Sequence, residues 1–289
     1  MKVFFNVFKL FRGISDLPVA VSDLHSSRQI RNAGIRQNLA KLHGGWNRVL
    51  CRFWPNAETT IHLNLAGAPE FVFRTYSSDL AVIQDILLKK VYDLPILRNL
   101  EAETVVDLGS NNGLTALWWR HLYPKARIIC VEPAESNLSL LRRNSRNVGN
   151  VEIVAAAVAG CDDPIEFNLY DAEWSHSSIE RPGRDVISKV TVRGTTLPSL
   201  LKELKIDTID LLKVDIEGAE VEVLPQLKLL RIPPRLILAE IHPPYNLAAF
   251  DRDVTAAGMH RISIDGWPDN ICVAERDHNR SESVPRTGI

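Results

Sequence analysis

The sequence predicts an α/β fold, in which a mainly parallel sheet is covered by helices on both faces. From residue 104 onward, short and almost wholly apolar segments alternate with segments of helical periodicity. Strands that are apolar on both sides must be buried on both sides, as they are in parallel sheets. The chain has 289 residues, of which 45% are hydrophobic and 24% charged. This is ordinary globular usage, and the length suffices for a large core.

The expected elements follow from the period of the apolar residues, which is two in strands and about 3.6 in helices. Strands are expected at 61–65, 71–73, 104–108, 127–131, 151–157, 209–214, 235–241, 261–264 and 271–274. Helices are expected at 80–94, 114–121, 135–147, 197–204, 220–229 and 247–257. Ser78 or Asp79 can cap the first helix, and Pro95 marks its end. Residues 165–169 and 186–192 predict a side hairpin or two edge strands.

These elements group into three expected parts. Residues 1–100 form an N-terminal cap of helices and a β-hairpin over the open edge of the sheet. Residues 101–275 form the main domain, and residues 276–289 a flexible tail.

Charge and cysteine content argue against several classes of protein. The 34 basic and 35 acidic side chains give a formal net charge of −1, so no overall field favours nucleic acid or an anionic membrane. The 4 cysteines have no C-x-x-C spacing, which favours reduced thiols over a zinc site or a disulfide framework. No apolar run reaches the roughly 18 residues of a membrane helix. We therefore expect a cytoplasmic protein with no nucleic-acid partner and no stable membrane insertion; its oligomeric state stays open.

The N-terminal segment is apolar and basic but lacks a convincing cleavage site for a signal peptidase. Residues 1–11 predict a docking or frayed helix, with an anchor on a membrane surface as the alternative.

A glycine-rich loop follows the strand at 104–108 and opens a helix. It lacks the lysine of a P-loop, and its glycines are out of register for the dinucleotide fingerprint G-x-G-x-x-G. The methyltransferase pattern acid-x-G-x-G-x-G fits at Asp107, Gly109 and Gly113, with Asn111 at the middle glycine. Asn is among the few residues that tolerate a left-handed backbone, so this departure is mild. We assign the loop, with Ser110, to the binding of a nucleotide-like cofactor.

An acidic residue ends the next strand. Glu132 stands where a carboxylate can grip two ribose hydroxyls. A turn glycine pair and an ordinary surface glutamate would be the alternative, but strand, loop, helix and acidic strand end together favour the cofactor site.

The chain from Asp79 to His242 resembles the FkbM-type S-adenosylmethionine-dependent methyltransferases. Four segments carry the resemblance: 75–79, 105–113, 195–197 and 210–220. The first 60 residues match no pattern. The resemblance implies a class I methyltransferase-like (Rossmann-like) sheet of seven strands and S-adenosylmethionine as the cofactor. It also implies transfer of a methyl group to a hydroxyl of a sugar or of a small molecule such as a polyketide.

Polar residues stand at the ends of two strands that this fold makes neighbours. Lys213, Asp215 and Glu217 alternate along one strand end, and Glu240 and His242 along the other. Ligands bind at this edge of open α/β sheets. The hypothesis is that His242 takes the proton of the acceptor, with Asp215 or Glu240 orienting its ring, and that Asp215 also contacts the cofactor. We expect Lys213 to be ion-paired, with Glu240 as a candidate partner.

Several alternatives stay open from the sequence. His242 could be an ordinary loop histidine, and the carboxylates beside it could hold a divalent cation, although their spacing demands none. We expect activity without a metal. The segment 174–178 could close over the site or be an ordinary loop. A nicotinamide-dependent (NAD(P)) oxidoreductase is the rival enzyme, and a non-catalytic nucleotide-binding or interaction module is the rival of another class.

Overall fold

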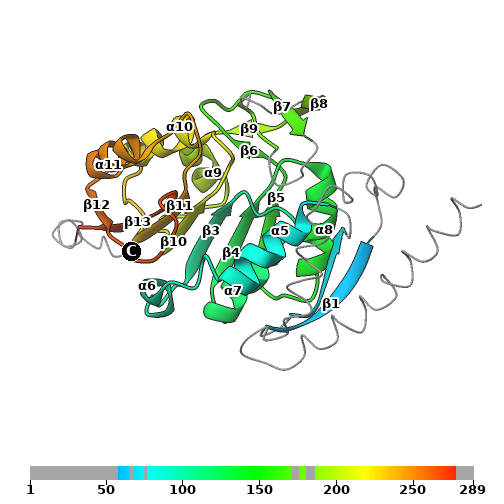
Figure 1. The fold of residues 1–289 in the computed structure, drawn as a ribbon. Coiled ribbons are helices and arrows are strands. Elements are labelled where there is room, and N and C mark those ends of the chain that lie inside the picture. The colour runs from blue at the N-terminus through cyan, green and yellow to red at the C-terminus, as the bar shows by residue number, and fades with distance from the viewer. Residues whose placement is uncertain (1–57, 66–67, 75–76, 171–175, 180–185, 278–289) are drawn as a thin grey trace, which may run out of the picture.

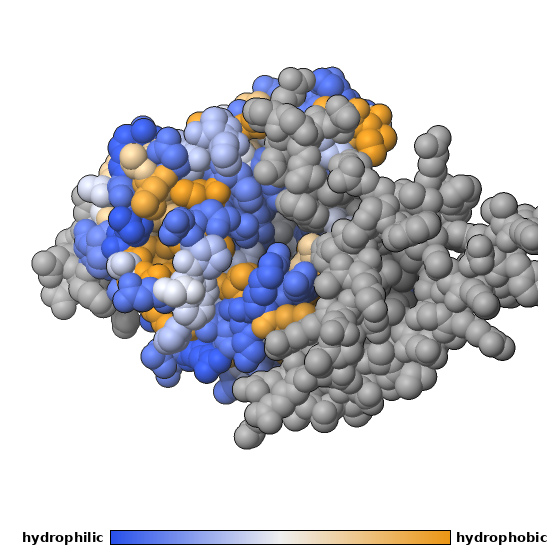
Figure 2. All heavy atoms as spheres, in the orientation of Figure 1, coloured by the Kyte–Doolittle hydropathy of each residue, from blue (hydrophilic) through white to orange (hydrophobic). Residues whose placement is uncertain are grey.

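The computed structural model describes residues 58–65, 68–74, 77–170, 176–179 and 186–277 (Figure 1). The expected helix at 1–11 lies outside the described residues, and so do residues 278–289 of the expected flexible tail. Arg276, the first residue of that expected tail, is instead the last residue of strand β13. On the face shown in Figure 2, the described surface is mostly hydrophilic, with small and separate apolar areas. Among the described residues, no helix combines the length and the apolar character needed to cross a bilayer.

The main sheet has seven strands in the order β12-β13-β11-β10-β3-β4-β5. The five strands β11, β10, β3, β4 and β5 are parallel, and β13 runs antiparallel to both β11 and β12. Their bounds are β3 Thr104–Leu108, β4 Arg127–Val131, β5 Val151–Val154, β10 Leu211–Val214, β11 Leu236–Glu240, β12 Met259–Ile262 and β13 Ile271–Arg276. The mainly parallel seven-stranded α/β sheet is therefore confirmed.

Helices cover both faces of this sheet because successive side chains of each strand point to opposite sides. Val105 and Ile128 pack into a core with α7 (Leu114–Leu122) and α8 (Glu135–Ser145). Their neighbours Val106 and Ile129 pack into a second core on the other face. That second core contains residues of α9 (Leu197–Glu203), α10 (Glu220–Val223), η4 (Leu224–Leu229) and α11 (Leu247–Ala256).

Two expected elements are divided in the structure. The expected strand 151–157 ends at Val154, and Ala157–Val158 (β6) pairs instead with Gly194–Thr195 (β9). The expected helix 220–229 is α10 followed by the 3₁₀ segment η4. Pro225 lies at the start of η4 and has no amide hydrogen, so the α-helical ladder cannot continue through it.

The helix expected at 80–94 also differs from its prediction. It begins at Asp79 as α5 (Asp79–Ile83), continues as the π-helical η2 (Gln84–Lys89), and ends at Lys90 in a left-handed conformation. Pro95 does not end this helix but opens α6 (Pro95–Arg98), since proline suits the first turn of a helix. Ser78 is the N-cap residue, but its side chain makes no capping hydrogen bond.

Two hairpins flank the sheet. The first joins β1 (Glu58–Leu65) to β2 (Ala68–Arg74), and the second joins β7 (Ile165–Tyr170) to β8 (Val186–Val192). Both are antiparallel, so both predicted hairpins are confirmed. β2 packs against α8, and Figure 1 shows the first hairpin beside that helix. The parts of the predicted cap that line the site are α5, η2 and, after η2, Val91 and Tyr92. The boundaries proposed for the three parts stay a prediction.

Candidate functional site

A cavity of about 320 Å³ lies at the carboxyl ends of β3, β4, β10 and β11. This is the edge where open α/β sheets bind their ligands. Its lining includes the glycine-rich loop, Glu132 after β4, and the polar ends of β10 and β11. Tyr92 and η2 contribute one wall. Pro268, Asn270 and Ile271, before and at the start of β13, contribute another. Loops far apart in the sequence therefore enclose one space.

The glycine-rich loop turns through three residues with left-handed backbones. Gly109, Asn111 and Gly113 have φ values of 80°, 47° and 90°. The expectation that Asn111 tolerates this conformation is met. The backbone amides of Gly109 and Ser110 donate to the carbonyl of Val131 at 2.9 and 3.1 Å, which fixes the loop against β4. The loop thereby presents its outer surface, residues 109–112, to the cavity.

Glu132 lies beneath the outer part of the loop and lines the cavity. It accepts hydrogen bonds from the Asn111 amide (3.0 Å), the Ala134 amide (2.9 Å) and Asn137 Nδ2 (3.3 Å). Each carboxylate oxygen can accept two hydrogen bonds, so Oε1 is fully used and Oε2 can still accept one from a ribose hydroxyl. Burial raises the pKa of Glu132 to about 7, although the three donors oppose this shift. The ribose role stays a proposal.

If Glu132 binds the ribose, we expect this shift to make cofactor binding dependent on pH. Ribose hydroxyls donate best to the ionised carboxylate, so ligand binding and ionisation favour each other. We expect the affinity for 5′-methylthioadenosine, which has no group titrating near neutrality, to rise about three- to tenfold from about pH 6 to about pH 8. Calorimetry across this range measures the effect.

Two variants define the control for this prediction. Glu132→Gln cannot ionise, so its affinity should be flat with pH, and Glu132→Ala should bind at least about tenfold more weakly than the native chain. An unchanged affinity in Glu132→Ala would remove the ribose assignment.

Asp107 and Lys213 form a buried ion pair under the loop. Lys213 Nζ lies 3.1 Å from Asp107 Oδ1, and it donates to the carbonyls of Gly109 (2.7 Å) and Leu108 (3.2 Å). Asp107 is fully buried and also accepts from Trp119 Nε1 at 3.0 Å. Asp107 therefore does not line the cavity: it supports the loop through Lys213 rather than touching a ligand.

The partner of Lys213 differs from the candidate suggested by the sequence. In the sheet register Lys213 stands opposite Asp107 of β3, and its second partner is Asp215 Oδ2 at 3.5 Å. Glu240 instead accepts from Asn270 Nδ2 at 3.0 Å. Burial alone would lower the pKa of Lys213, but Asp107 and Asp215 outweigh it and raise the pKa, so the ammonium stays charged.

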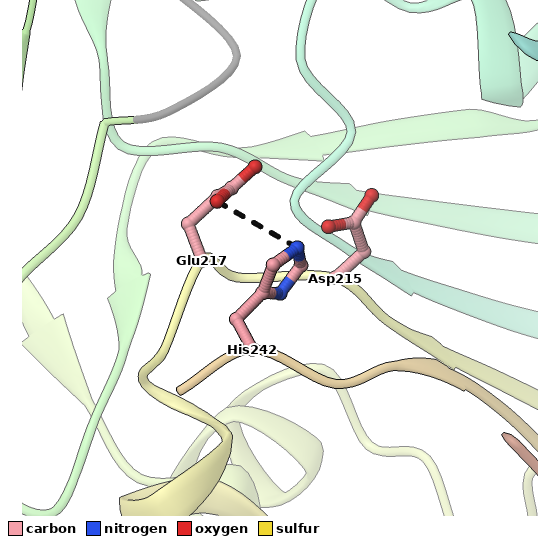
Figure 3. A group of neighbouring side chains, drawn as sticks. All are labelled: Asp215, Glu217 and His242. Carbon is pink, nitrogen blue, oxygen red and sulfur yellow. Dashed lines mark ion pairs between the residues drawn. The ribbon is translucent and has the colours of Figure 1, made fainter. Parts of the chain in front are cut away.

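His242 lies after β11 with its ring directed at the loop that follows β10 (Figure 3). Its Nε2 is 3.7 Å from both Glu217 Oε2 and Glu240 Oε1. Its Nδ1 is 3.1 Å from Glu220 Oε1, and Glu220 is fully buried. The carboxylate nearest the ring is thus Glu220, which the sequence reasoning did not consider, while Glu240 lies 3.7 Å from Nε2. The orienting role expected of Asp215 or Glu240 stays a prediction.

Glu220 takes this position because the chain turns tightly before α10. Its carboxylate accepts from the backbone amides of Ile216 (3.2 Å) and Gly218 (2.7 Å) as well as facing His242. From the sequence alone, Glu220 is explained as an acidic residue that stabilises the first turn of a helix. Nothing in the sequence therefore indicates its contact with His242. Its position two residues after Gly218 is the signal that could have indicated a turn-stabilising carboxylate.

His242 is nine-tenths buried and stands behind the cavity wall, whereas Glu217 and Glu240 line it. Burial and the nearby Asp215 raise the pKa of Glu240 to about 7, so Glu240 can gain or lose a proton near neutrality. Burial alone would lower the pKa of His242, but the bond to Glu220 and the surrounding carboxylates raise it. Glu240 and His242 therefore form a pair able to hold a proton at the cavity surface.

Tyr92 is a site residue that the sequence reasoning missed. Its hydroxyl donates to Asp215 Oδ2 at 3.1 Å, and its ring lies 6.0 Å from Lys213 Nζ. Burial and the neighbouring Asp215 hold the pKa of Tyr92 well above its ordinary value, so it stays a donor. The Tyr92 hydroxyl and Lys213 both engage the same oxygen of Asp215. No sequence motif marks Tyr92, which reaches the site from outside the main sheet.

The expected loop at 174–178 is described from residue 176. His176 and Ser178 line the cavity, and Ser177 Oγ donates to the carbonyl of Glu217 at 2.8 Å. The described part of this loop therefore forms part of the cavity wall.

Asp215, Glu217 and His242 also have the spacing of a metal site. Ligand atoms of the three residues lie within 4.8 Å of one another. Oxygen and imidazole nitrogen donors could hold a divalent cation there, where it would act as a Lewis acid on a bound hydroxyl.

The strand order, the glycine-rich loop after β3 and the acidic residue after β4 are those of the class I methyltransferase fold. The family model described as the methyltransferase FkbM domain matches residues 107–256. The chain therefore belongs to the FkbM methyltransferase family, and S-adenosylmethionine is its cofactor.

Individual relatives are distant. Methyltransferase 1 of Beauveria bassiana is 25% identical over 161 residues, which cover 49% of this chain and 64% of the relative. The 2-O-methyltransferase NoeI of Sinorhizobium fredii is 25% identical over 134 residues, which cover 42% of this chain and 55% of NoeI. The match thus spans between half and two-thirds of each relative. A solved structure of Aeropyrum pernix fibrillarin with bound S-adenosyl-L-methionine aligns at a TM-score of 0.37 and 14% identity, covering 76% of this chain and 82% of fibrillarin.

Proposed function

We propose that this chain transfers the methyl group of S-adenosylmethionine to a hydroxyl oxygen of a small molecule or sugar. One observation carries the proposal: a single cavity is lined by the glycine-rich loop and Glu132 on one side and by Asp215 and Glu240 on the other. The first side suits the nucleoside of the cofactor. The second offers carboxylates that can orient a hydroxyl and accept its proton.

The reaction forms one bond to carbon and breaks another. Bound S-adenosylmethionine would supply the methyl group: the acceptor oxygen would bond to the methyl carbon, the carbon–sulfur bond would break, and its electron pair would stay on sulfur in S-adenosylhomocysteine. The hydroxyl proton passes to the Glu240–His242 pair, whose imidazole Glu220 holds in place. Asp215, fixed by Tyr92 and Lys213, positions the oxygen behind the methyl group.

The charges of the cavity favour a neutral acceptor. Carboxylates of Asp85, Glu132, Asp215, Glu217 and Glu240 line it. The ammonium groups of Lys89 and Lys213, which also line it, are already held by ion pairs. A phosphorylated acceptor would bring further negative charge to this acidic lining, which is unfavourable at short range. Neutral hydroxyls, in contrast, donate to carboxylates. The name of the relative NoeI, a 2-O-methyltransferase, agrees with oxygen as the atom methylated.

Paired acceptors test this proposal directly. Isotopically labelled S-adenosylmethionine is supplied with a set of glycosides and polyketide alcohols, and with the phosphate ester of each. Label should enter neutral acceptors and not their phosphates. Calorimetry in parallel should show binding of S-adenosylhomocysteine but not of NAD⁺ or NADP⁺. Binding of a nicotinamide dinucleotide would favour the oxidoreductase, and cofactor binding without transfer to any acceptor would favour a non-catalytic module.

We expect turnover to need no added metal. The sulfonium already carries the positive charge that draws the nucleophile, and charge is dispersed as the oxygen attacks. Turnover measured with a chelator should therefore equal turnover with added magnesium or manganese. Loss of turnover in the chelator that a metal restores would make Asp215, Glu217 and His242 the candidate ligands.

A further inference from the structure

Helix α8 carries two buried asparagines on one side, two turns apart. Asn137 is 2% exposed and Asn144 6% exposed. A buried amide is costly unless it is hydrogen-bonded, so each needs partners inside the protein. Each asparagine has one partner residue in β2. Its other partner lies in the glycine-rich loop or is Glu132.

Asn144 joins β2 to the glycine-rich loop. Its Oδ1 accepts from the Val72 amide at 2.8 Å, and its Nδ2 donates to the Val72 carbonyl at 2.9 Å. The same Nδ2 donates to the carbonyl of Asn112 at 2.8 Å. One side chain thus binds both backbone groups of a strand residue and a carbonyl inside the loop.

Asn137 makes the corresponding connection to Glu132. Its Nδ2 donates to Glu132 Oε1 at 3.3 Å, and its Oδ1 accepts from Arg74 Nη2 at 2.8 Å. Arg74 is the last residue of β2 and is held by Asp79 at the start of α5. Its Nε and Nη2 donate to the two Asp79 oxygens at 3.0 and 2.6 Å, and both side chains are buried. Asn137 therefore links Glu132 to a buried ion pair.

We propose that Asn137 and Asn144 are positioning residues that make the β1–β2 hairpin part of the cofactor site. Resting on the proposed roles of Glu132 and the glycine-rich loop, this inference extends the site to residues outside the matched region 107–256. Asn144 sets the distance of the loop from α8, and Asn137 sets the orientation of the Glu132 carboxylate. The hairpin supplies the second anchor for each.

Two substitutions test the proposal in the full chain. Asn137→Leu and Asn144→Leu keep a similar volume and remove the hydrogen bonds. Each should weaken S-adenosylhomocysteine binding about tenfold in calorimetry, at unchanged stoichiometry. The matched control is Arg143→Ala, since Arg143 also joins α8 to the hairpin, through an ion pair with Glu58 at 2.6 Å, but does so on the exposed surface. Its binding constant should stay native.

A double-mutant cycle separates positioning from mere folding. Asn137 itself lines the cavity, so the cycle also tests for direct contact with the ligand. If Asn137 acts through Glu132, Asn137→Leu should have little further effect in a Glu132→Gln background. With Glu132 retained, the same substitution should move the pH midpoint for binding of 5′-methylthioadenosine upward. A lower stoichiometry with a native dissociation constant, or additive effects in the cycle, would overturn the proposal. If Asn144→Leu does not fold, Asn144→Asp, which keeps the acceptor for the Val72 amide, must show the same weakening. Failure of the native chain to bind S-adenosylhomocysteine would instead count against the proposed function.

Discussion

Gly109→Ala should lower the affinity for S-adenosylhomocysteine by at least about 100-fold, which corresponds to about 2.7 kcal/mol. The backbone of Gly109 has a φ of +80°, and a Cβ added there would lie 1.9 Å from the carbonyl oxygen of Asp215. That contact is with backbone, so either the loop or the end of β10 must move. Both line the cavity, and either movement separates the cofactor-binding side from the acceptor side. Calorimetry and the melting temperature should both report the change.

Two other glycines, Gly149 and Gly113, provide the comparison for this variant. A Cβ at Gly149, just after α8, would meet nothing within 4 Å, so Gly149→Ala should leave affinity and melting temperature close to native. At Gly113, which also has a positive φ, a Cβ would lie 2.9 Å from the end of the Leu141 side chain, and we expect an intermediate effect. A Gly109→Ala chain that folds and binds within threefold of native would contradict this account of the loop.

His242→Ala should slow turnover by about 10²–10⁴ and leave the affinity for S-adenosylmethionine nearly unchanged. Without the imidazole, Glu240 loses the group that shares the proton, and the buried Glu220 faces an empty space. Affinity should be unaffected because the proposed cofactor contacts, Glu132 and the glycine-rich loop, are not among the ion-pair partners of His242. Single-turnover rates, measured with a saturating cofactor, separate the chemical step from binding.

A second histidine serves as the control for His242. His260 also pairs with a carboxylate, Asp277 at 2.8 Å, but on the exposed surface of β12. His260→Ala should therefore turn over at the native rate. If His242→Ala folds and turns over within threefold of native, His242 is a structural residue. Asp215→Asn, measured in the same way, would then show whether Asp215 accepts the proton.

Local sequence patterns were sufficient to predict the sheet and the loop. Apolar runs placed the strands within a few residues, because a strand buried on both faces has few other possible compositions. The left-handed conformation of Asn111 followed from its place in a glycine pattern. Pro225 could have predicted the change from α10 to η4, since it cannot donate within a helix. These features depend on neighbours in the chain.

Side-chain partners across the site were less predictable because they depend on distant segments. Tyr92 and Asp215 are 123 residues apart in the chain, and no spacing rule connects them. The sequence suggested Glu240 as the partner of Lys213, and only the sheet register shows that Lys213 faces Asp107. Glu220 was the least visible, since its role depends on a turn that brings its carboxylate under His242. The sequence showed which acidic residues lie at this edge of the sheet, but not which side chains they bind.

The most direct test of the central claim is the position of the transferred methyl group. Extracts are incubated with the protein and S-adenosylmethionine labelled in its methyl carbon, and labelled products are identified by mass spectrometry and nuclear magnetic resonance. We expect a neutral product in which one hydroxyl hydrogen is replaced by the labelled methyl group, and no such product with His242→Ala. A labelled methyl group on nitrogen or carbon, or no labelled product from a protein that binds S-adenosylhomocysteine, would contradict the assignment.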